Sequence, residues 1–272
     1  MRVTPRSILR AVPNKISGMM HRAKVRSQIR PSDVFLVTYP KSGTIWLSFL
    51  VANVLKSDPI EQLNLQSLLK YVPDINEAYF HRGSLANYEA RQDPRVFSLH
   101  APYDPAFSKV VYVVRDPRDV MVSYWHFRRL TEPEFNLSLG EFIETDMHWP
   151  CRWDEHVSGW IMKHNHPNLL VVRYEDMREN TVRELSRIIE FCGLSYTESK
   201  IEDAVAVSGF GNMQQLEKQF GIHGVVGVRN GSFVRRGQIG GWRNELDESC
   251  LRYIESKYYS VMDRVGYKPV TR

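Results

Sequence analysis

The sequence predicts a single α/β domain in which helices flank a central parallel sheet. Three short apolar runs, at residues 33–40, 109–117 and 168–176, are rich in Val and Leu and do not alternate strictly with polar residues. This pattern is typical of strands buried on both faces. Each run is followed by a helical pattern, and strands that alternate with helices along a chain build a parallel sheet. No repeat and no long Gly/Ser/Pro linker divides the 272-residue chain after residue 31, so we expect one domain there.

The remaining elements are predicted from apolar periodicity and from capping residues. Ligands of such folds collect beyond the carboxyl ends of the strands, so the turns that leave the strands are where we look for function. In chain order, we expect a strand at 33–40, a helix at 43–56, a shorter strand at 94–102, a strand at 109–117, helices at 117–130, 137–145 and 153–164, a strand at 168–176, a helix at 178–192 that stops at Gly193, and an amphipathic helix within 250–272 that ends near Gly266.

Composition excludes several classes of protein. No run of 18 or more apolar residues is present and no signal-peptide pattern is visible, so we expect a soluble, cytoplasmic protein. Cys151, Cys192 and Cys250 are odd in number, widely spaced and without a CxxC motif. Their arrangement argues against a disulfide framework and against a zinc site, and we predict no metal.

The positive charge is concentrated at the N-terminus. Residues 1–30 carry eight Lys and Arg side chains and no acid, and without them the net charge of +5 becomes −3. Residues 1–31 are therefore predicted to form a basic N-terminal arm ahead of a domain at 32–272. The arm has some amphipathic character, so weak contact with an anionic membrane surface is one interpretation and a solvated tail is the other. We expect no nucleic-acid partner.

The turn after the first strand has the composition of an anion site. Lys41, Ser42, Gly43 and Thr44 lie where the strand gives way to a helix, whose first N–H groups lack intrahelical partners and whose dipole favours negative charge. Gly43 allows close approach of the main chain, the two hydroxyls donate, and Lys41 adds charge. Because Lys41 precedes the glycine, the loop is not a Walker A motif and implies no Mg²⁺. An ordinary capped turn is the alternative.

Two further segments repeat this chemistry. Arg115 ends the strand at 109–117, where its guanidinium can bind a phosphate at the same edge as Lys41, or form a surface ion pair with a neighbouring Asp. Near the C-terminus, Arg235, Arg236 and Gly237 form a basic, glycine-containing loop that is suited to close over an anion. Two anion sites on one edge favour a ligand with two separated phosphates.

Together these segments resemble those of the cytosolic sulfotransferase family. TYPKSGTIWL (38–47) is similar to the family's 5′-phosphosulfate loop, with Ile45 in place of a threonine, and this P-loop-like turn is therefore identified as the phosphosulfate-binding loop. VVYVVRDPRDVMVSYWHF (110–127) resembles the family's 3′-phosphate strand and helix. FVRRGQIGGWRNEL (233–246) resembles its RKGxxGDWKN element, with Gly241 in place of the aspartate.

The resemblance implies an enzyme that transfers the sulfuryl group of 3′-phosphoadenylyl sulfate (PAPS) to a hydroxyl or amine and releases 3′,5′-bisphosphoadenosine (PAP). Carried over by position, Trp46 would lie against the adenine, and these residues would bind the nucleotide: Lys41, Ser42, Gly43, Thr44, Ile45 and Trp46 at the 5′ end, Arg115, Ser123, Arg235, Arg236 and Gly237 at the 3′-phosphate, and Tyr174, Ser208 and Phe210 around the adenosine. Plain packing in the core is the alternative for Trp46 and Phe210.

The resemblance also implies the catalytic pair. His100 matches the family's catalytic histidine, and a histidine suits the removal of a proton from the acceptor at neutral pH, while Lys41 would stabilise the transferring group. The family usually has a lysine two residues before this histidine, but Ser98 stands there in this chain. We expect either that Lys41 suffices, that Lys109 or Arg118 compensates, or that turnover is slow.

The acceptor is less well defined by the sequence. Aromatic residues suit a phenol, an alcohol or a sterol-like acceptor, whereas nearby polar residues suit a sugar. The expected aromatic walls are Tyr79, Phe80, Tyr103, Phe107, Trp149 and Trp153, for which ordinary core packing is an equal alternative. The polar alternatives are His81, Arg82, Asp104 and Asp146. Two other functions stay open at this stage, a non-catalytic PAP/PAPS-binding protein and a P-loop-type kinase. The family's dimerisation pattern is not recognisable, which leaves the oligomeric state undetermined.

Overall fold

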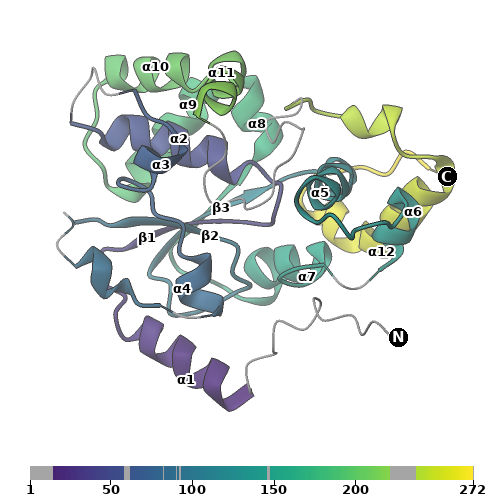
Figure 1. The fold of residues 1–272 in the computed structure, drawn as a ribbon, viewed down its shortest axis with the longest axis horizontal. Coiled ribbons are helices and arrows are strands. Elements are labelled where there is room, and N and C mark those ends of the chain that lie inside the picture. Colours follow the sequence, from purple (N-terminus) through teal and green to yellow (C-terminus); the bar gives the residue numbers. More distant parts are fainter. Residues whose placement is uncertain are drawn as a thin grey trace, which may run out of the picture.

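The computed structural model describes residues 15–57, 62–81, 83–89, 91, 93–145, 148–220 and 237–271. Its centre is a four-stranded, fully parallel sheet with the strand order β2-β1-β3-β4 (Figure 1). The strands are β1 (Val34–Thr38), β2 (Val96–Leu99), β3 (Lys109–Val114) and β4 (Leu169–Arg173). Each lies inside one of the four predicted runs, so the predicted α/β fold with a parallel sheet is confirmed.

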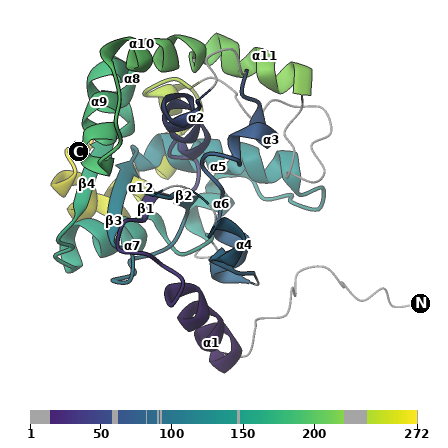
Figure 2. The ribbon, with the colours of Figure 1, turned by 90° about the vertical axis from the view of Figure 1, so that its left-hand side faces the viewer.

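Helices cover both faces of the sheet, as Figures 1 and 2 show. Residues such as Phe35 and Val37 point into one hydrophobic core, and Val34 and Leu36 point into the other, because successive side chains of a strand face opposite sides. The helices are α1 (Lys15–Arg26), α2 (Thr44–Leu55), α3 (Leu65–Leu68), α4 (Asn76–Phe80), α5 (Pro117–Thr131), α6 (Leu139–Glu144), α7 (Trp153–Ser158), α8 (Tyr174–Glu179), α9 (Thr181–Cys192), α10 (Glu198–Val207), α11 (Phe210–Phe220) and α12 (Glu248–Arg264).

Most predicted helices are present, with three differences. The helix predicted at 178–192 is two helices, because Asn180 leaves the helical conformation and its side chain accepts the N–H of Arg183 as the cap of α9. The helix predicted at 153–164 ends as α7 at Ser158 and continues as a π-turn over Gly159–Lys163. Helices α1, α3, α4, α10 and α11 were not predicted. The helix near the C-terminus ends at Arg264, just before Gly266, which has a φ of 83°.

Part of the predicted basic arm packs on the domain. Helix α1 lies against α4, where His21 Nε2 donates to the carbonyl of Ala78 over 2.6 Å. Arg26 Nε donates to the carboxylate of Asp104 over 2.9 Å, and Val25 is fully buried. His21, Val25 and Arg26 therefore contact the domain and do not belong to a solvated tail, whereas the division of the chain at residue 31 stays a prediction. Among the described helices, none combines the length and the apolar composition that crossing a membrane requires.

Candidate functional site

A cavity of about 390 Å³ opens at the carboxyl edge of the sheet. It gathers most of the residues predicted to bind the nucleotide or to act in catalysis, although they come from distant segments. Its lining includes Lys41, Gly43, Thr44, Ile45, Trp46, His100, Arg115, Ser123, Tyr174, Phe210 and Gly237. Ser42 and Ser208 are fully buried and do not line it. Arg235 and Arg236 lie outside the described residues.

The loop between β1 and α2 is held in an unusual backbone conformation. Lys41 has a φ of 69° and Gly43 a φ of 101°, so both lie in the left-handed region, which a lysine adopts only at a cost. A Cβ at Gly43 would approach the ring of Tyr174 to 2.8 Å. The hydroxyl of Ser42 is buried and has no hydrogen-bond partner among the described residues. A buried donor in a loop at a helix N-terminus is suited to an anionic ligand, so the loop fits a phosphosulfate group.

Arg115 ties together three segments of the cavity wall. Its Nη1 donates to the carbonyl of Lys41 over 2.9 Å, and its Nη2 donates to the carbonyl of Gln238 over 3.3 Å. The guanidinium lies 4.4 Å from the centre of the Tyr174 ring. Its buried Nε finds no partner in the described part of the chain. Arg115 therefore organises the site and still has an unused donor, which suits a phosphate.

Aromatic side chains also line the cavity. The Trp46 indole packs edge-on against Tyr174 with ring centres 5.8 Å apart, and its Nε1 donates to the carbonyl of Ser208 over 3.1 Å. A Cβ at Gly237 would meet the Phe210 ring at 2.8 Å, so this glycine is needed for close packing. The main-chain carbonyl of Ser208 thus holds the Trp46 indole in place.

Arg178 is a cavity residue that our sequence analysis missed. Its guanidinium lies 5.4 Å from the centre of the Trp46 ring, and the side chain lines the cavity. It follows Tyr174 by four residues on the helix α8, so a helical reading of 174–178 would have placed both on one face.

His100 lies just after β2 and is fixed at three points. Its ring Nδ1 lies 2.8 Å from the carbonyl of Thr38, and its main-chain N–H donates to Asn76 Oδ1 over 2.9 Å. Its own carbonyl lies 3.2 Å from His156 Nε2. Because a carbonyl only accepts, Nδ1 must carry the proton, which makes Nε2 the basic nitrogen.

Electrostatic surroundings keep His100 neutral near pH 7. Burial lowers the pKa of His100 below the ordinary value of 6.5, and the charge of Lys41 lowers it further. The carboxylate of Asp74 and the hydrogen bond to Thr38 act in the opposite direction. A neutral imidazole with its Nε2 unprotonated has the form that a general base requires.

His156 is a second histidine that the sequence analysis did not single out. It is fully buried, and its Nδ1 lies 2.8 Å from the hydroxyl of Tyr112. Burial lowers the pKa of His156 to about 3. It therefore stays neutral, donates through Nε2 to the His100 carbonyl and accepts from Tyr112. Its position on α7 is that of a core residue, and no sequence signal separates it from an ordinary core histidine.

The expectation that Lys109 or Arg118 replaces the missing lysine at Ser98 is wrong. Lys109 begins β3 at the opposite end of the strand from the cavity, and its amine lies 5.8 Å from the centre of the Phe191 ring. Arg118 is buried, bound by carboxylates and absent from the lining of the cavity. Lys41 is the lysine that lines the cavity among the described residues.

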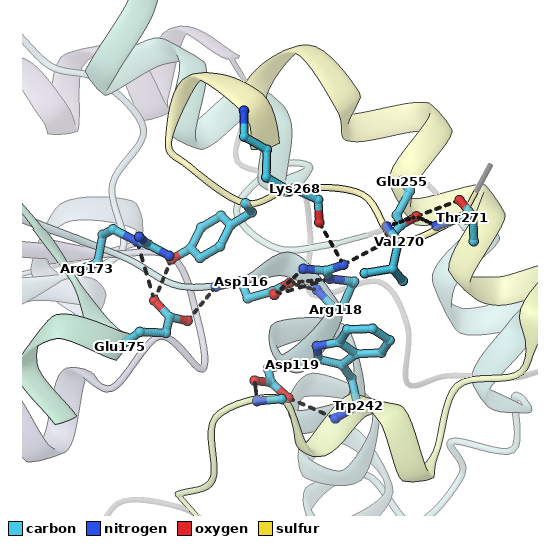
Figure 3. Close-up of polar contacts among 12 residues, drawn as sticks. Asp116, Arg118, Asp119, Arg173, Glu175, Trp242, Glu255, Lys268, Val270 and Thr271 are labelled. Carbon is cyan, nitrogen blue, oxygen red and sulfur yellow. Dashed lines mark hydrogen bonds and ion pairs between the residues drawn. The ribbon is translucent and has the colours of Figure 1, made fainter. Parts of the chain in front are cut away.

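Arg118 is instead the centre of a buried polar network behind the cavity (Figure 3). Its Nη2 lies 2.7 Å from Asp116 Oδ2 and its Nη1 lies 2.6 Å from Glu255 Oε1, while the guanidinium lies 4.4 Å from the centre of the Trp242 ring. Nη1 also donates to the carbonyl of Lys268 over 3.2 Å. The network fixes the turn that follows Arg115 against α12.

Two neighbouring carboxylates extend this support, as Figure 3 shows. Asp119 accepts the N–H groups of Gly240 and Trp242 over 2.8 and 2.9 Å, which holds the loop that contains Gly237. Glu175 accepts the N–H of Asp116 over 3.1 Å and the hydroxyl of Tyr267 over 2.6 Å. Side chains of α5 and α8 thus hold the turn after β3 and the loop that contains Gly237 in place.

We expect the network to make stability depend on pH through Glu255. Burial alone would raise the pKa of Glu255, but hydrogen bonds from Thr271, Val270 and Arg118 outweigh it and hold the pKa below 4.5. A lowered pKa stabilises the fold above pH 4.5, and this contribution is lost as the pH falls through the folded-state pKa. Glu255→Gln should cost about 1–3 kcal/mol at pH 7. Urea unfolding at several pH values measures the free energy of unfolding.

In the Glu255→Gln variant, the free energy of unfolding should fall less between pH 5 and pH 3 than in the wild type. Glu248→Gln removes an exposed carboxylate at the start of the same helix, which pairs with Arg252, and it is the control that should change the free energy of unfolding much less. Parallel pH dependences of the Glu255 variant and the wild type would contradict the prediction.

The predicted acceptor walls are largely core residues. Of the six aromatic residues, Trp149 alone lines the cavity. Tyr79, Phe107 and Trp153 are buried in the core, while Phe80 packs on Trp149 and Tyr103 stacks on His164.

The described residues of the polar alternative, His81 and Asp104, do not line the cavity either. Asp104 is buried and bonded to Arg26 and Tyr79, and His81 does not line the cavity. Arg82 and Asp146 lie outside the described residues.

Other side chains that were not expected line the cavity instead. Tyr124 and Phe127 contribute rings, and Asp74 and Glu245 contribute carboxylates. Phe127 follows Ser123 by four residues and thus shares its face of α5, which is a signal that the sequence offered. The amine of Lys41 lies 4.4 Å from the centre of the Phe127 ring, so the loop between β1 and α2 contacts this part of the cavity wall.

Comparison with known proteins gives a consistent result. The family model described as "Sulfotransferase domain" matches residues 31–266. Cytosolic sulfotransferase 1 of Danio rerio is 32% identical, with 89% of this chain and 86% of that protein covered. Cytosolic sulfotransferase 13 of Arabidopsis thaliana is 31% identical, with 89% and 80% covered.

Solved structures agree on the fold. A mouse sulfotransferase in complex with PAP superimposes with a TM-score of 0.69 at 21% identity, over 92% of this chain and 90% of that one. Retinol dehydratase in complex with androsterone and inactive cofactor PAP gives a TM-score of 0.69 at 21% identity, over 94% and 87%.

Proposed function

This chain belongs to the sulfotransferase domain family and is a PAPS-dependent sulfotransferase, and on that premise we propose that His100 is its general base and that Lys41 stabilises the transferring group. The family assignment removes the kinase and the non-catalytic alternatives. The observation that carries the proposal is the orientation of His100, whose Nδ1 is bound to the Thr38 carbonyl while its Nε2 is left as the base beside the same cavity as Lys41.

The chemistry follows from these two side chains. His100 Nε2 takes the proton of the acceptor hydroxyl or amine as the acceptor atom bonds to sulfur and the bond from sulfur to the departing phosphate oxygen breaks. The electrons of that bond stay on the leaving phosphate, where the charge of Lys41 and the N–H groups that begin α2 stabilise them. With Ser98 in place of the family's usual lysine, Lys41 carries this role without a second lysine.

The remaining predicted residues are proposed to bind the nucleotide. Ser42 and the loop around Gly43 would hold the 5′-phosphosulfate, and the buried, unpartnered Ser42 hydroxyl supports this role. Arg115 with Ser123 and Gly237 would hold the 3′-phosphate, supported by the unpartnered Arg115 Nε, and Arg235 and Arg236 would join them. Trp46, Phe210 and Arg178 would contact the adenosine.

The acceptor is proposed to be a small planar phenol or alcohol. The aromatic rings of Tyr124, Phe127 and Trp149 beside His100 favour a flat apolar body, as in a phenol or a sterol-like alcohol, over a sugar. Androsterone and retinol appear with structural relatives of this chain, which is in keeping with an apolar acceptor. We also propose a cytoplasmic location, which is supported by the names of the cytosolic relatives, and weak membrane contact through the basic arm.

We expect transfer without a metal, because the loop places its lysine before the glycine and provides no Walker-type Mg²⁺ site. The test incubates the protein with labelled PAPS and a panel of phenols, sterols, sugars and amines, with and without EDTA. Labelled product should form equally in both conditions and most rapidly with phenols or sterols. A requirement for Mg²⁺ and ATP would contradict the assignment, and transfer only to sugars would contradict the acceptor class.

A further inference from the structure

Asp74 lies beside the catalytic histidine in an arrangement that the sequence did not suggest. The segment 73–75 pairs with β2 through two main-chain bonds, from Ile75 N to the Ser98 carbonyl and from Ser98 N to the Pro73 carbonyl, each 3.0 Å long. This pairing places the Asp74 side chain on the lining of the cavity together with His100.

The Asp74 carboxylate also fixes the residue that holds the His100 main chain. Its Oδ1 accepts the Asn76 N–H over 2.8 Å, and its Oδ2 accepts from Asn76 Nδ2 over 3.1 Å. Because the carboxylate only accepts, the amide nitrogen of Asn76 must face it, which leaves Asn76 Oδ1 to accept the His100 N–H. One carboxylate therefore orients the amide that positions the histidine.

We propose that Asp74 is a positioning residue for the reaction, which holds His100 through Asn76 and stabilises the imidazolium that forms when His100 takes the acceptor proton. From the proposed function, this inference takes only the role of His100 as general base. In the described part of the chain, the charged and titratable groups that act on His100 are Asp74, Lys41 and His156. Lys41 carries a positive charge and His156 is neutral, so Asp74 is the anion among them.

The charge of Asp74 should make His100 a stronger base. A nearby negative charge favours the protonated form of a histidine, so Asp74 should raise the proton affinity of His100 and make it a stronger base. Without the charge of Asp74, His100 should stay unprotonated down to a lower pH and should therefore be a weaker base. The side chain of Asp74 is exposed, so solvent screens the effect, and we expect a shift of about 0.5 to 1 pH unit.

The first experiment needs no substrate. The titration of His100 is followed by NMR of the imidazole in the full chain, with its resonance assigned from the His100→Gln variant. Asp74→Asn should lower the midpoint by about 0.5 to 1 pH unit. Glu77→Gln is the matched control, since it removes a carboxylate three residues away that does not line the cavity, and it should leave the midpoint in place. An unchanged His100 midpoint in Asp74→Asn would overturn the proposal.

The second experiment separates positioning by Asp74 from a general structural defect. In Asp74→Asn, the plateau of kcat should fall about three- to tenfold and the acid limb of kcat/KM should move to lower pH, while KM for PAPS stays unchanged. If Asp74 had only a structural role, its replacement would lower the plateau of kcat without moving the acid limb of kcat/KM. That result would overturn the proposal that Asp74 stabilises the imidazolium. If His100→Gln turns over normally, the proposed base fails, whatever the NMR midpoint shows.

A variant of Asn76 tests whether this residue connects Asp74 to the main chain of His100. Asn76→Ala removes the acceptor for the His100 N–H but keeps the charge of Asp74, so it should lower kcat with little movement of the acid limb. Full activity in this variant would overturn the positioning part of the proposal.

Discussion

In the His100→Gln variant, kcat is expected to fall by about 10²- to 10⁴-fold while PAP binds as before, because a positioned general base contributes a factor of this size. Glutamine can still donate to the Thr38 carbonyl, so the turn after β2 should keep its shape, but it has no nitrogen that can take the acceptor's proton. Turnover with labelled PAPS measures the loss, and calorimetric titration with PAP measures binding.

Another histidine provides the control for this experiment. His164 is exposed and stacks on Tyr103 away from the cavity, so His164→Gln should leave both kcat and PAP affinity unchanged. Turnover of His100→Gln within threefold of the wild type would rule out the base role. Loss of PAP affinity in the same variant would mean that His100 acts on the nucleotide site instead.

The pH dependence of the wild type offers an independent check. Burial and Lys41 lower the pKa of His100, and a base works only when it is unprotonated. The acid limb of kcat/KM is therefore expected below pH 6.5. A limb above that value would indicate that the opposing charge of Asp74 outweighs burial.

The sheet and the anion edge could be predicted from the sequence because each depends on local chemistry. Buried strands such as β1 and β3 are short apolar runs that need no knowledge of their neighbours. The parallel topology then brings the ends of these strands to one edge, which is why Lys41 and Arg115 were predicted to lie together. His100, which lines the same cavity, was singled out only by the resemblance to the sulfotransferase family.

The acceptor end could not be predicted in the same way. Phe107 and Trp149 are both large aromatic residues in loops, yet one is buried in the core and the other lines the cavity. Which of them faces a cavity is decided by packing between distant elements and not by composition. The same holds for Arg118, whose partner Glu255 lies 137 residues further along the chain.

Replacement of Arg115 is expected to have the largest effect on nucleotide binding. Arg115→Met removes the guanidinium proposed to bind the 3′-phosphate, and a charge-assisted hydrogen bond contributes about 1.5–3 kcal/mol. It also removes the bonds to the carbonyls of Lys41 and Gln238, which hold the two anion loops in one arrangement. We expect PAP affinity to fall by about 10²-fold or more, measured by calorimetric titration.

Two further variants show whether charge or geometry is responsible. Arg115→Lys keeps the charge but cannot span both carbonyls and a phosphate, because a single ammonium lacks the planar fork of a guanidinium. It should therefore recover only part of the lost affinity. Arg129→Met removes an exposed arginine near the end of α5, where it lies over Trp125, and should leave PAP affinity unchanged.

The outcomes for Arg115 distinguish two views of the cavity edge. If Arg115→Lys binds PAP as the wild type does, charge alone is sufficient and the bonds that join the loops are incidental. If both Arg115 variants bind PAP normally, the 3′-phosphate lies elsewhere and the proposed nucleotide site is wrong. If Arg115→Met loses affinity and Arg115→Lys recovers only part of it, one guanidinium both binds the phosphate and holds the two loops that surround it, which accounts for its burial at the end of β3.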